Sequence, residues 1–182
     1  MTDEPRHLVI GAGSGVDVGI NVNSLSRSGT TNVFLQPNVK WRIFDNKTDG
    51  VAAAAGGILY TQVSPREIGP SYGFLYAEMS KKVKSGTYAP RFHAGTYAIL
   101  HAGSSWVGPK GGAFFGYEQP IQSKASIVAD WLTGKNTFGY FTPGLSFTLP
   151  LNSVFNAGYS FGNDSFHGND NRFLSVYYGI TF

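Results

Sequence analysis

The C-terminal stretch Arg172–Phe182, RFLSVYYGITF, decides the fold that the sequence predicts. Large side chains recur at every second position along it. A period of two is typical of a β-strand, because successive side chains of a strand point to opposite faces of the sheet. One face carries Leu174, Val176, Tyr178, Ile180 and Phe182, and the other carries Phe173, Ser175, Tyr177, Gly179 and Thr181. The stretch therefore predicts a strand with one continuous apolar face.

The same alternation recurs through most of the chain. The clearest case is the stretch from Val33 to Phe44, in which one face is apolar and the other carries Gln36, Asn38, Lys40 and Arg42 together with Phe34 and Phe44. Between the alternating stretches lie clusters of Gly, Pro, Asn, Asp and Ser, which favour turns. The further alternating stretches are residues 51–63, 72–83, 91–101, 113–119, 126–133, 138–149 and 153–162. The sequence thus predicts an all-β, antiparallel, up-and-down sheet.

The number of strands depends on the stretch from His7 to Asn23, HLVIGAGSGVDVGINVN. All its larger apolar residues except Val9 occupy even positions, so it forms either one long strand or a hairpin turned at its glycines. Closure of an antiparallel barrel favours an even number of strands. We therefore predict about 10 strands, the first being this long one, with twelve as the alternative if a further strand precedes Met1.

The same stretch contains VIGAGSG, which resembles a phosphate-binding turn. In a dinucleotide-binding fold a glycine would be needed where Val16 stands, and a helix would follow. Strand-like alternation follows instead, so we interpret the glycines as a bend, a bulge or a tight turn.

Composition favours a single sheet-rich domain over residues 1–182. Aromatic residues make up 15% of the chain, charged residues only 14%, and there are 24 glycines, which suits a sheet with many turns. The net charge of +3 is small and the Lys and Arg residues are scattered, which argues against a nucleic-acid partner. The chain has no Cys, which excludes disulfides and thiolate metal sites.

The distribution of polar residues and turns favours a barrel in lipid. The polar face of the stretch from Val33 to Phe44 is charged at its middle, while the apolar face is uninterrupted, as expected for a wet lumen and a lipid-facing exterior. Along the chain, short turns at one rim should alternate with long loops at the other rim, and the turn at 134–136 is the exception. The shorter connections are expected near residues 46–50, 84–89, 120–124 and 150–152, and the longer ones near 24–32, 64–71, 102–112 and 163–171.

The face opposite the apolar one collects charges of both signs. A barrel of about ten strands is too narrow for a wide aqueous pore, so two interpretations stay open. The charges either pair and fill the interior, or line a narrow channel or cavity for a small polar or amphipathic solute, with Lys40, Arg42 and Arg91 setting any anion preference. The predicted lumen residues are Asp17, Lys40, Arg42, Glu78, Lys82, Arg91, Glu118 and Asp130.

Other polar residues form no recognisable catalytic or metal-binding pattern. His93 and His101 would share a strand face but lie too far apart to bind one metal, so each is interpreted as a packing or rim residue. Asp164, His167 and Asp170 fall in a glycine-containing loop, which positions catalytic groups poorly. We predict no enzyme activity, no catalytic or metal-binding residue and no cofactor. Aromatic belts at the membrane interfaces are expected to include Trp41, Tyr97, Trp131 and Tyr178.

Several segments together resemble uncharacterised bacterial outer-membrane β-barrel proteins of a transporter or porin-like type, over nearly the whole chain. They are NVFLQPNVKWRIF, YGFLYAEMSKK, FGYFTPGLSFTLP, NAGYSFGND and YYGITF. The resemblance implies an outer-membrane location, lipid and the barrel assembly machinery as partners, and Tyr178, Ile180 and Phe182 as an assembly signal. The start, MTDEPRH, lacks the features of a signal peptide, which export would require upstream.

Three functions remain open, because proteins of this kind share architecture more than activity. The first is a small outer-membrane barrel acting as a narrow channel or transporter for a small solute. The second is a plugged barrel with a structural or surface-interaction role. The third is a soluble all-β ligand-binding protein whose apolar faces point inward.

Overall fold

The structure is a computed structural model that describes residues 6–11, 15–27, 30–64, 71–83, 86, 88–101, 108–150, 153–163 and 172–180. These ranges contain eleven strands that form one sheet. The strands are β1 (Arg6–Gly11), β2 (Val16–Arg27), β3 (Thr30–Asn46), β4 (Val51–Ser64), β5 (Tyr72–Lys82), β6 (Arg91–Leu100), β7 (Gly111–Gln122), β8 (Ala125–Leu132), β9 (Tyr140–Leu149), β10 (Ser153–Gly162) and β11 (Arg172–Ile180).

In the described part of the chain, no helix has the length and apolar character needed to cross a membrane.

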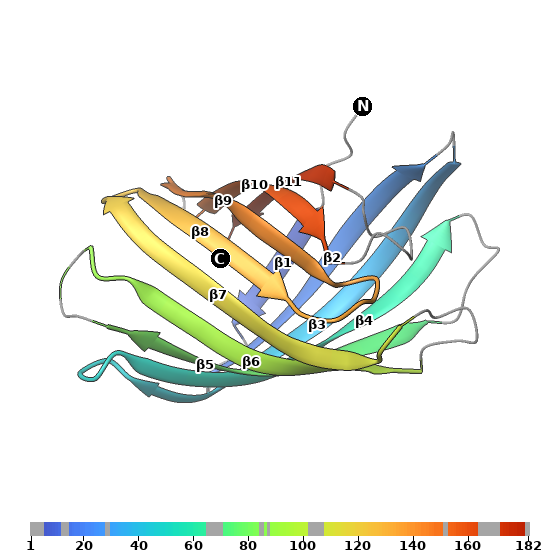
Figure 1. Cartoon of the computed structure of the whole chain (residues 1–182). Coiled ribbons are helices and arrows are strands. Elements are labelled where there is room, and N and C mark those ends of the chain that lie inside the picture. Colours follow the sequence, from blue (N-terminus) through green and yellow to red (C-terminus); the bar gives the residue numbers. More distant parts are fainter. Residues whose placement is uncertain are drawn as a thin grey trace.

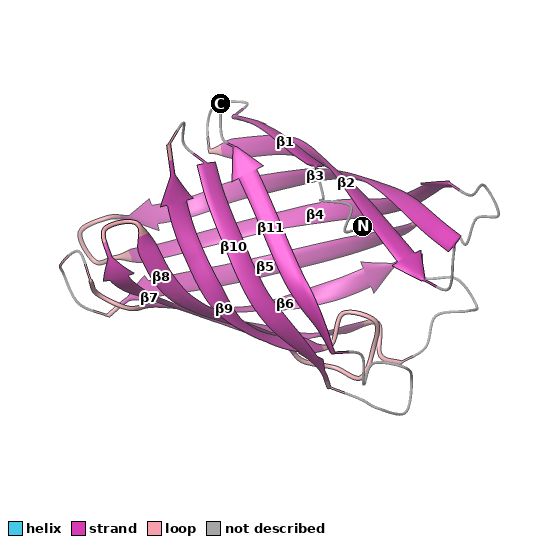
Figure 2. Ribbon diagram, turned by 90° about the horizontal axis from the view of Figure 1, so that it is seen from above, coloured by secondary structure: helices cyan, strands magenta, loops and turns pink. Residues whose placement is uncertain are grey.

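The strands follow one another in the sheet in chain order, and each neighbouring pair is antiparallel. The sheet curls round on itself until β11 comes alongside β1, with Cα atoms of the two strands within 8 Å (Figures 1 and 2). Within the described residues the hydrogen-bonded pairing runs from β1 to β11 and stops at this seam. The predicted all-β, antiparallel, up-and-down sheet is confirmed, and it curls into the shape of a barrel whose seam has no hydrogen-bonded pairing within the described residues.

The strand number differs by one from the ten predicted, because residues 7–23 form a hairpin and not one long strand. The pairing of β1 with β2 sets Leu8 opposite Ile20 and Ile10 opposite Val18. Even positions thus oppose even positions, so the alternation continues unchanged through the turn and could not reveal it. Gly15 lies in this turn with a φ of +76°, a conformation that favours glycine. With eleven strands that alternate in direction, β1 and β11 run parallel at the seam.

Apolar side chains cover the outside of the barrel. Phe74 and Tyr97 face each other inside it, so the alternate residues Leu75, Ala98 and Leu100 lie on the outer face. Large apolar side chains on that face are strongly exposed, including Met79 at 61% and Leu174 at 67%. Others on the outer face with more than a third of their surface exposed are Val39, Trp41, Leu59, Phe92, Phe115, Ile127, Trp131, Phe141, Leu145 and Phe161.

A β-bulge in β3 changes one predicted face. The register between β3 and β4 shifts between Arg42 and Phe44, which brings Phe44 opposite the outward-facing Ala53. Ile43 and Phe44 are therefore both about half exposed on the outer face, at 52% and 50%. The prediction that Phe44 shares the polar face is wrong, because an extra residue at a bulge reverses the alternation beyond it.

The connections differ in part from the predicted alternation of lengths. The strand ends Arg27, Ser64, Leu100, Leu132 and Gly162 lie at one rim, and the strand ends Gly11, Asn46, Lys82, Gln122 and Leu149 lie at the other. The long loop predicted near 24–32 is wrong, because β2 and β3 extend to Arg27 and Thr30 and only residues 28–29 join them. We call the first rim the long-loop rim and the second the short-turn rim.

The small residues of β4 make room for large side chains inside the barrel. Gly56 lies opposite Tyr76 of β5 and opposite Lys40 of β3. A Cβ atom at Gly56 would lie 2.5 Å from the Tyr76 hydroxyl and 2.6 Å from the Val39 carbonyl oxygen. This agrees with the expectation that small residues in this strand accept large lumen side chains.

Gly56→Ala is predicted to lower the free energy of unfolding by about 1–3 kcal/mol, because the added methyl group collides with backbone as well as with Tyr76. Gly73→Ala is the control, since its Cβ would meet only Leu100 at an ordinary distance of 3.6 Å. Urea unfolding of the folded protein measures both. Equal unfolding midpoints for the two variants would contradict the close approach at Gly56.

Candidate functional site

The interior near the long-loop rim is filled by aromatic side chains, which we call the aromatic cluster. Its buried centre is Phe74, Tyr97 and Ile99, and seven partly buried residues pack against it. The Phe74 ring stacks on Tyr97 with centroids 5.1 Å apart and meets the edge of Phe138 at the same distance. The surrounding residues are Ile58, Tyr60, Tyr72, Tyr76, Phe114, Leu132 and Phe138.

Two of the residues predicted for aromatic belts lie on the outer face, which a belt requires, and one does not. Trp41 and Trp131 are 52% and 44% exposed on the outer face. Tyr97 is only 4% exposed and belongs to the aromatic cluster, so its assignment to a belt is wrong. Its position on β6 has the same parity as Arg91, which places it inside. The side chain of Tyr178 lies outside the described part of the structure.

The connection at residues 133–139 is folded against the aromatic cluster by Asn136, which is 2% exposed. The Asn136 amide nitrogen donates to the Tyr97 hydroxyl and to the Pro109 carbonyl, each at 2.9 Å. Its amide oxygen accepts from the backbone N–H of Phe138, also at 2.9 Å. These bonds hold the Phe138 ring in the cluster, so this connection closes part of the interior near its rim.

Polar side chains line two cavities inside the barrel, and His93 lines both. The first, which we call the acidic cavity, has a volume of about 330 Å³ and is lined by Glu118, Asp130, Thr142, Ser146 and Asn156. The second, which we call the basic cavity, has a volume of about 250 Å³. Its polar lining residues other than His93 are Lys40, Arg42, Asp45, Glu78, Ser80 and Arg91.

The charges of the basic cavity are largely paired. Lys40 Nζ lies 2.9 Å from Glu78 Oε1, and Arg42 Nη1 lies 3.8 Å from Asp45 Oδ2. The Arg42 contact depends on the bulge in β3, which returns Asp45 to the inner face three residues after Arg42. Arg91 Nη1 donates to the Ser80 hydroxyl at 3.2 Å. Opposite charges therefore bridge β3 to β5.

The carboxylates of the acidic cavity have fewer partners. Glu118 Oε1 accepts a hydrogen bond of 3.2 Å from the Ser126 hydroxyl. Asp130 and His93 lie on either side of Gly116, because a Cβ atom at Gly116 would be 3.1 Å from both Asp130 Oδ1 and His93 Cβ. Within the described residues, neither Glu118 nor Asp130 forms an ion pair.

The structure brings most of the predicted lumen residues together. Four line the basic cavity and two line the acidic cavity, while Asp17 lies opposite Lys40 in the pairing of β2 with β3. Lys82 lines neither cavity and lies at the end of β5 opposite Arg91. The six cavity-lining members are Lys40, Arg42, Glu78, Arg91, Glu118 and Asp130.

Sequence reasoning did not single out His93, Thr142, Ser146 or Asn156 as lumen site residues. Each has the parity of the inner face on its strand, and that parity is the signal that could have identified it. His101 does not share the strand of His93, because β6 ends at Leu100.

Several predicted residues lie beyond what the structure describes. Residues 164–170, which include the three polar residues weighed as a catalytic set, and Phe182 of the predicted assembly signal are outside the described residues. Tyr178 and Ile180 lie on β11 opposite Phe155 and Ser153 of β10, and their side chains are not described. In the described ranges no group of three His, Asp or Glu residues is arranged to hold a metal ion.

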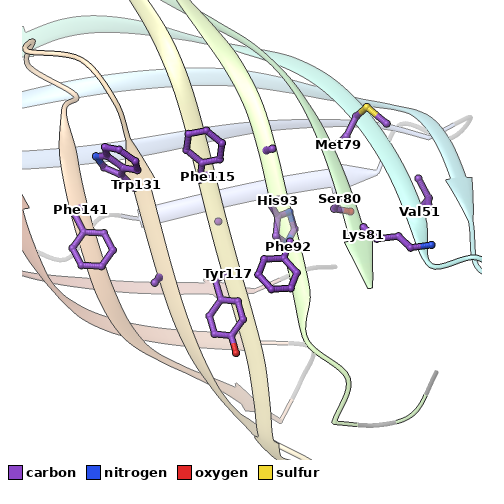
Figure 3. A pocket seen from close by; sticks show the side chains of 13 residues that line it. Val51, Met79, Ser80, Lys81, Phe92, His93, Phe115, Tyr117, Trp131 and Phe141 are labelled. Carbon is purple, nitrogen blue, oxygen red and sulfur yellow. The ribbon is translucent and has the colours of Figure 1, made fainter. Parts of the chain in front are cut away.

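The outer face carries an apolar hollow of about 630 Å³ across β4–β9. Met79, Phe92, Phe115, Trp131 and Phe141 surround it, as Figure 3 shows. Apolar side chains supply nearly all of its surface, which gives a polar solute few groups to bind. We therefore take the two interior cavities, and not this hollow, as the candidate site.

Comparison of this chain with protein-family models, with curated proteins and with solved structures finds no match.

Asn136→Ala is predicted to lower the free energy of unfolding by about 1–3 kcal/mol, because it leaves buried hydrogen-bonding groups without a partner. The control is Asn46→Ala, which removes hydrogen bonds to Asp49 in an exposed turn. Water replaces those bonds, so its cost should stay below about 1 kcal/mol. Chemical unfolding of both variants measures the difference, and an Asn136→Ala protein as stable as wild type would contradict the anchoring role.

Proposed function

We propose that this protein is a small outer-membrane β-barrel that acts as a narrow channel or transporter for a small solute. The observation that carries the proposal is the inverted distribution of side chains, with apolar residues outside and charged residues inside. A folded chain in water gains stability by burying apolar surface. This barrel instead exposes that surface on its strands, which is favourable when lipid surrounds them.

The magnitude of the hydrophobic effect supports a lipid environment. Full removal of a large apolar side chain from water is worth about 1.5–3 kcal/mol. Outward residues such as Trp41, Met79 and Leu174 keep half or more of their surface exposed. Because such residues occur on strands all round the barrel, the loss in water would be many times the contribution of any one of them. The soluble alternative would need these faces to point inward.

The interior supports a small solute. Cavities of about 330 and 250 Å³ are polar and meet at His93. Ligand pockets for drug-sized molecules cover roughly 300–1,000 Å³, so these cavities suit small molecules. The aromatic cluster narrows the other end of the interior, which favours the plugged barrel as the second candidate.

Leu145→Arg tests whether lipid surrounds the barrel. Leu145 lies at the middle of β9 on the outer face and is 42% exposed. In a membrane barrel an outward Arg near the midplane should cost about 2–4 kcal/mol of folding free energy. In a soluble protein the same change on a water-facing surface should fall within about 0.5 kcal/mol.

Ser146→Arg is the matched control, because Ser146 is the next residue and lines the acidic cavity. The measurement is the folded fraction after refolding into lipid vesicles, read from heat-modifiable migration on a detergent gel. A Leu145→Arg protein that folds as well as Ser146→Arg, or a monodisperse wild-type monomer without detergent, would overturn the membrane assignment.

Bilayer conductance separates the channel from the plugged barrel. A channel should give wild-type conductance steps, and Phe138→Ala should enlarge them because Phe138 packs in the aromatic cluster. Phe141→Ala is the control, since Phe141 is an outward ring on the neighbouring strand β9 and should leave the steps unchanged. If neither the wild-type protein nor Phe138→Ala gives conductance steps, the result contradicts the channel and supports the plugged barrel.

A further inference from the structure

We propose that the acidic cavity binds small organic cations, with a primary ammonium group as the recognised chemistry. The inference rests on the proposed function only in that a solute must reach the barrel interior. It names the class of solute that this interior selects, and it follows from the partners of the charged side chains.

The first observation is the contrast between the carboxylates of the two cavities. In the basic cavity Glu78 and Asp45 have cationic partners at 2.9 and 3.8 Å. In the acidic cavity no ion pair reaches Glu118 or Asp130 within the described residues, and Asp130 is open to solvent there. A carboxylate without an ion-pair partner attracts a mobile cation that enters the cavity beside it.

The second observation is an unused acceptor in the same cavity. The Asn156 amide oxygen is buried and has no hydrogen-bond partner in the described part of the chain. Asn156 lines the acidic cavity together with Thr142, whose hydroxyl shares a hydrogen bond of 2.8 Å with Ser160, and Ser146, and both hydroxyl oxygens can accept a further hydrogen bond. An unpaired buried acceptor is costly, and an ammonium group brings three donors and no acceptor. Together with the carboxylates of Glu118 and Asp130, these acceptors can receive the three N–H donors of an ammonium group.

The third observation is that a pair of glycines in its wall leaves the acidic cavity open. Gly144 of β9 lies directly opposite Gly158 of β10, and both line the acidic cavity. A Cβ atom at Gly144 would lie 2.5 Å from the Ala157 carbonyl oxygen and 2.9 Å from Gly158 Cα. No side chain can occupy this part of the wall, so a cavity of about 330 Å³ remains for a solute of a few heavy atoms.

Basic side chains lie next to both carboxylates of the acidic cavity, since His93 faces Asp130 across Gly116 and Arg91 lies opposite Glu118. Arg91 lies opposite Glu118 in the pairing of β6 with β7 but makes no ion pair with it, and it lines the basic cavity. Its guanidinium donates to Ser80. Lys40 and Arg42 already have carboxylate partners, which weakens the anion preference predicted for them. An ammonium group is repelled by Arg91 and attracted by Asp130.

The test measures binding of two probes of similar size and opposite charge to the folded full-length chain in detergent. We expect n-propylammonium to bind and propionate to bind at least about tenfold more weakly, because the carboxylates of Glu118 and Asp130 attract the cation and repel the anion. Asp130→Asn should weaken n-propylammonium binding by about tenfold. Asp45→Asn removes the same charge from the basic cavity and should leave that affinity unchanged.

Glu118→Gln replaces Asp130→Asn if that variant fails to fold, as judged by heat-modifiable migration. Preferential binding of propionate, or a folded variant of the acidic cavity that binds n-propylammonium as wild type does, would overturn the proposal.

The cation-site proposal and the channel proposal fail separately. Cation binding without conductance contradicts only the channel, and conductance with anion preference contradicts only the cation site.

Discussion

The structure depends on a strict alternation that gives each strand one face toward the barrel interior and one toward the outside. The register transmits this alternation from strand to strand. One row runs through Lys40, Gly56, Tyr76 and Tyr97 on β3, β4, β5 and β6, all on the inner face. A shift of one residue in any pair would bring charged side chains outside and apolar ones inside. The separation of polar and apolar surfaces therefore fixes the register of the whole sheet.

Within that register, the placement of glycine decides where the interior is filled and where it is open. Toward the long-loop rim a glycine faces a ring, as Gly56 faces Tyr76 and Gly95 faces Phe114. The ring then crosses the space above the glycine and joins the aromatic cluster. In the wall of the acidic cavity a glycine faces another glycine, Gly144 opposite Gly158, and no ring crosses. The same residue type thus supports a packed region and a cavity, according to its partner across the strands.

The sequence predicted the faces of most strands because alternation is a local property that pairing preserves. Prediction from the sequence failed where a turn or a bulge leaves no distinct pattern of residues. The hairpin within residues 7–23 keeps even positions opposite even positions, and the bulge beside Phe44 reverses parity without a Gly or Pro to mark it. Asn136 was also beyond prediction, since its partners Tyr97 and Pro109 are far away in the chain and meet it only in the folded barrel.

The balance of charge in the interior likewise depends on pairing and not on composition. The chain has 14 Lys and Arg residues against 11 Asp and Glu residues, which alone would favour anions. Pairing across β3 and β5 occupies Lys40 with Glu78, and the bulge occupies Arg42 with Asp45. Asp130, flanked by Gly116, has no cation beside it in an ion pair within the described residues. The acidic cavity therefore holds carboxylates without an ion pair in the described part of the chain, although the net charge of the chain is +3, because the field at any point depends most on the unpaired charges nearest to it.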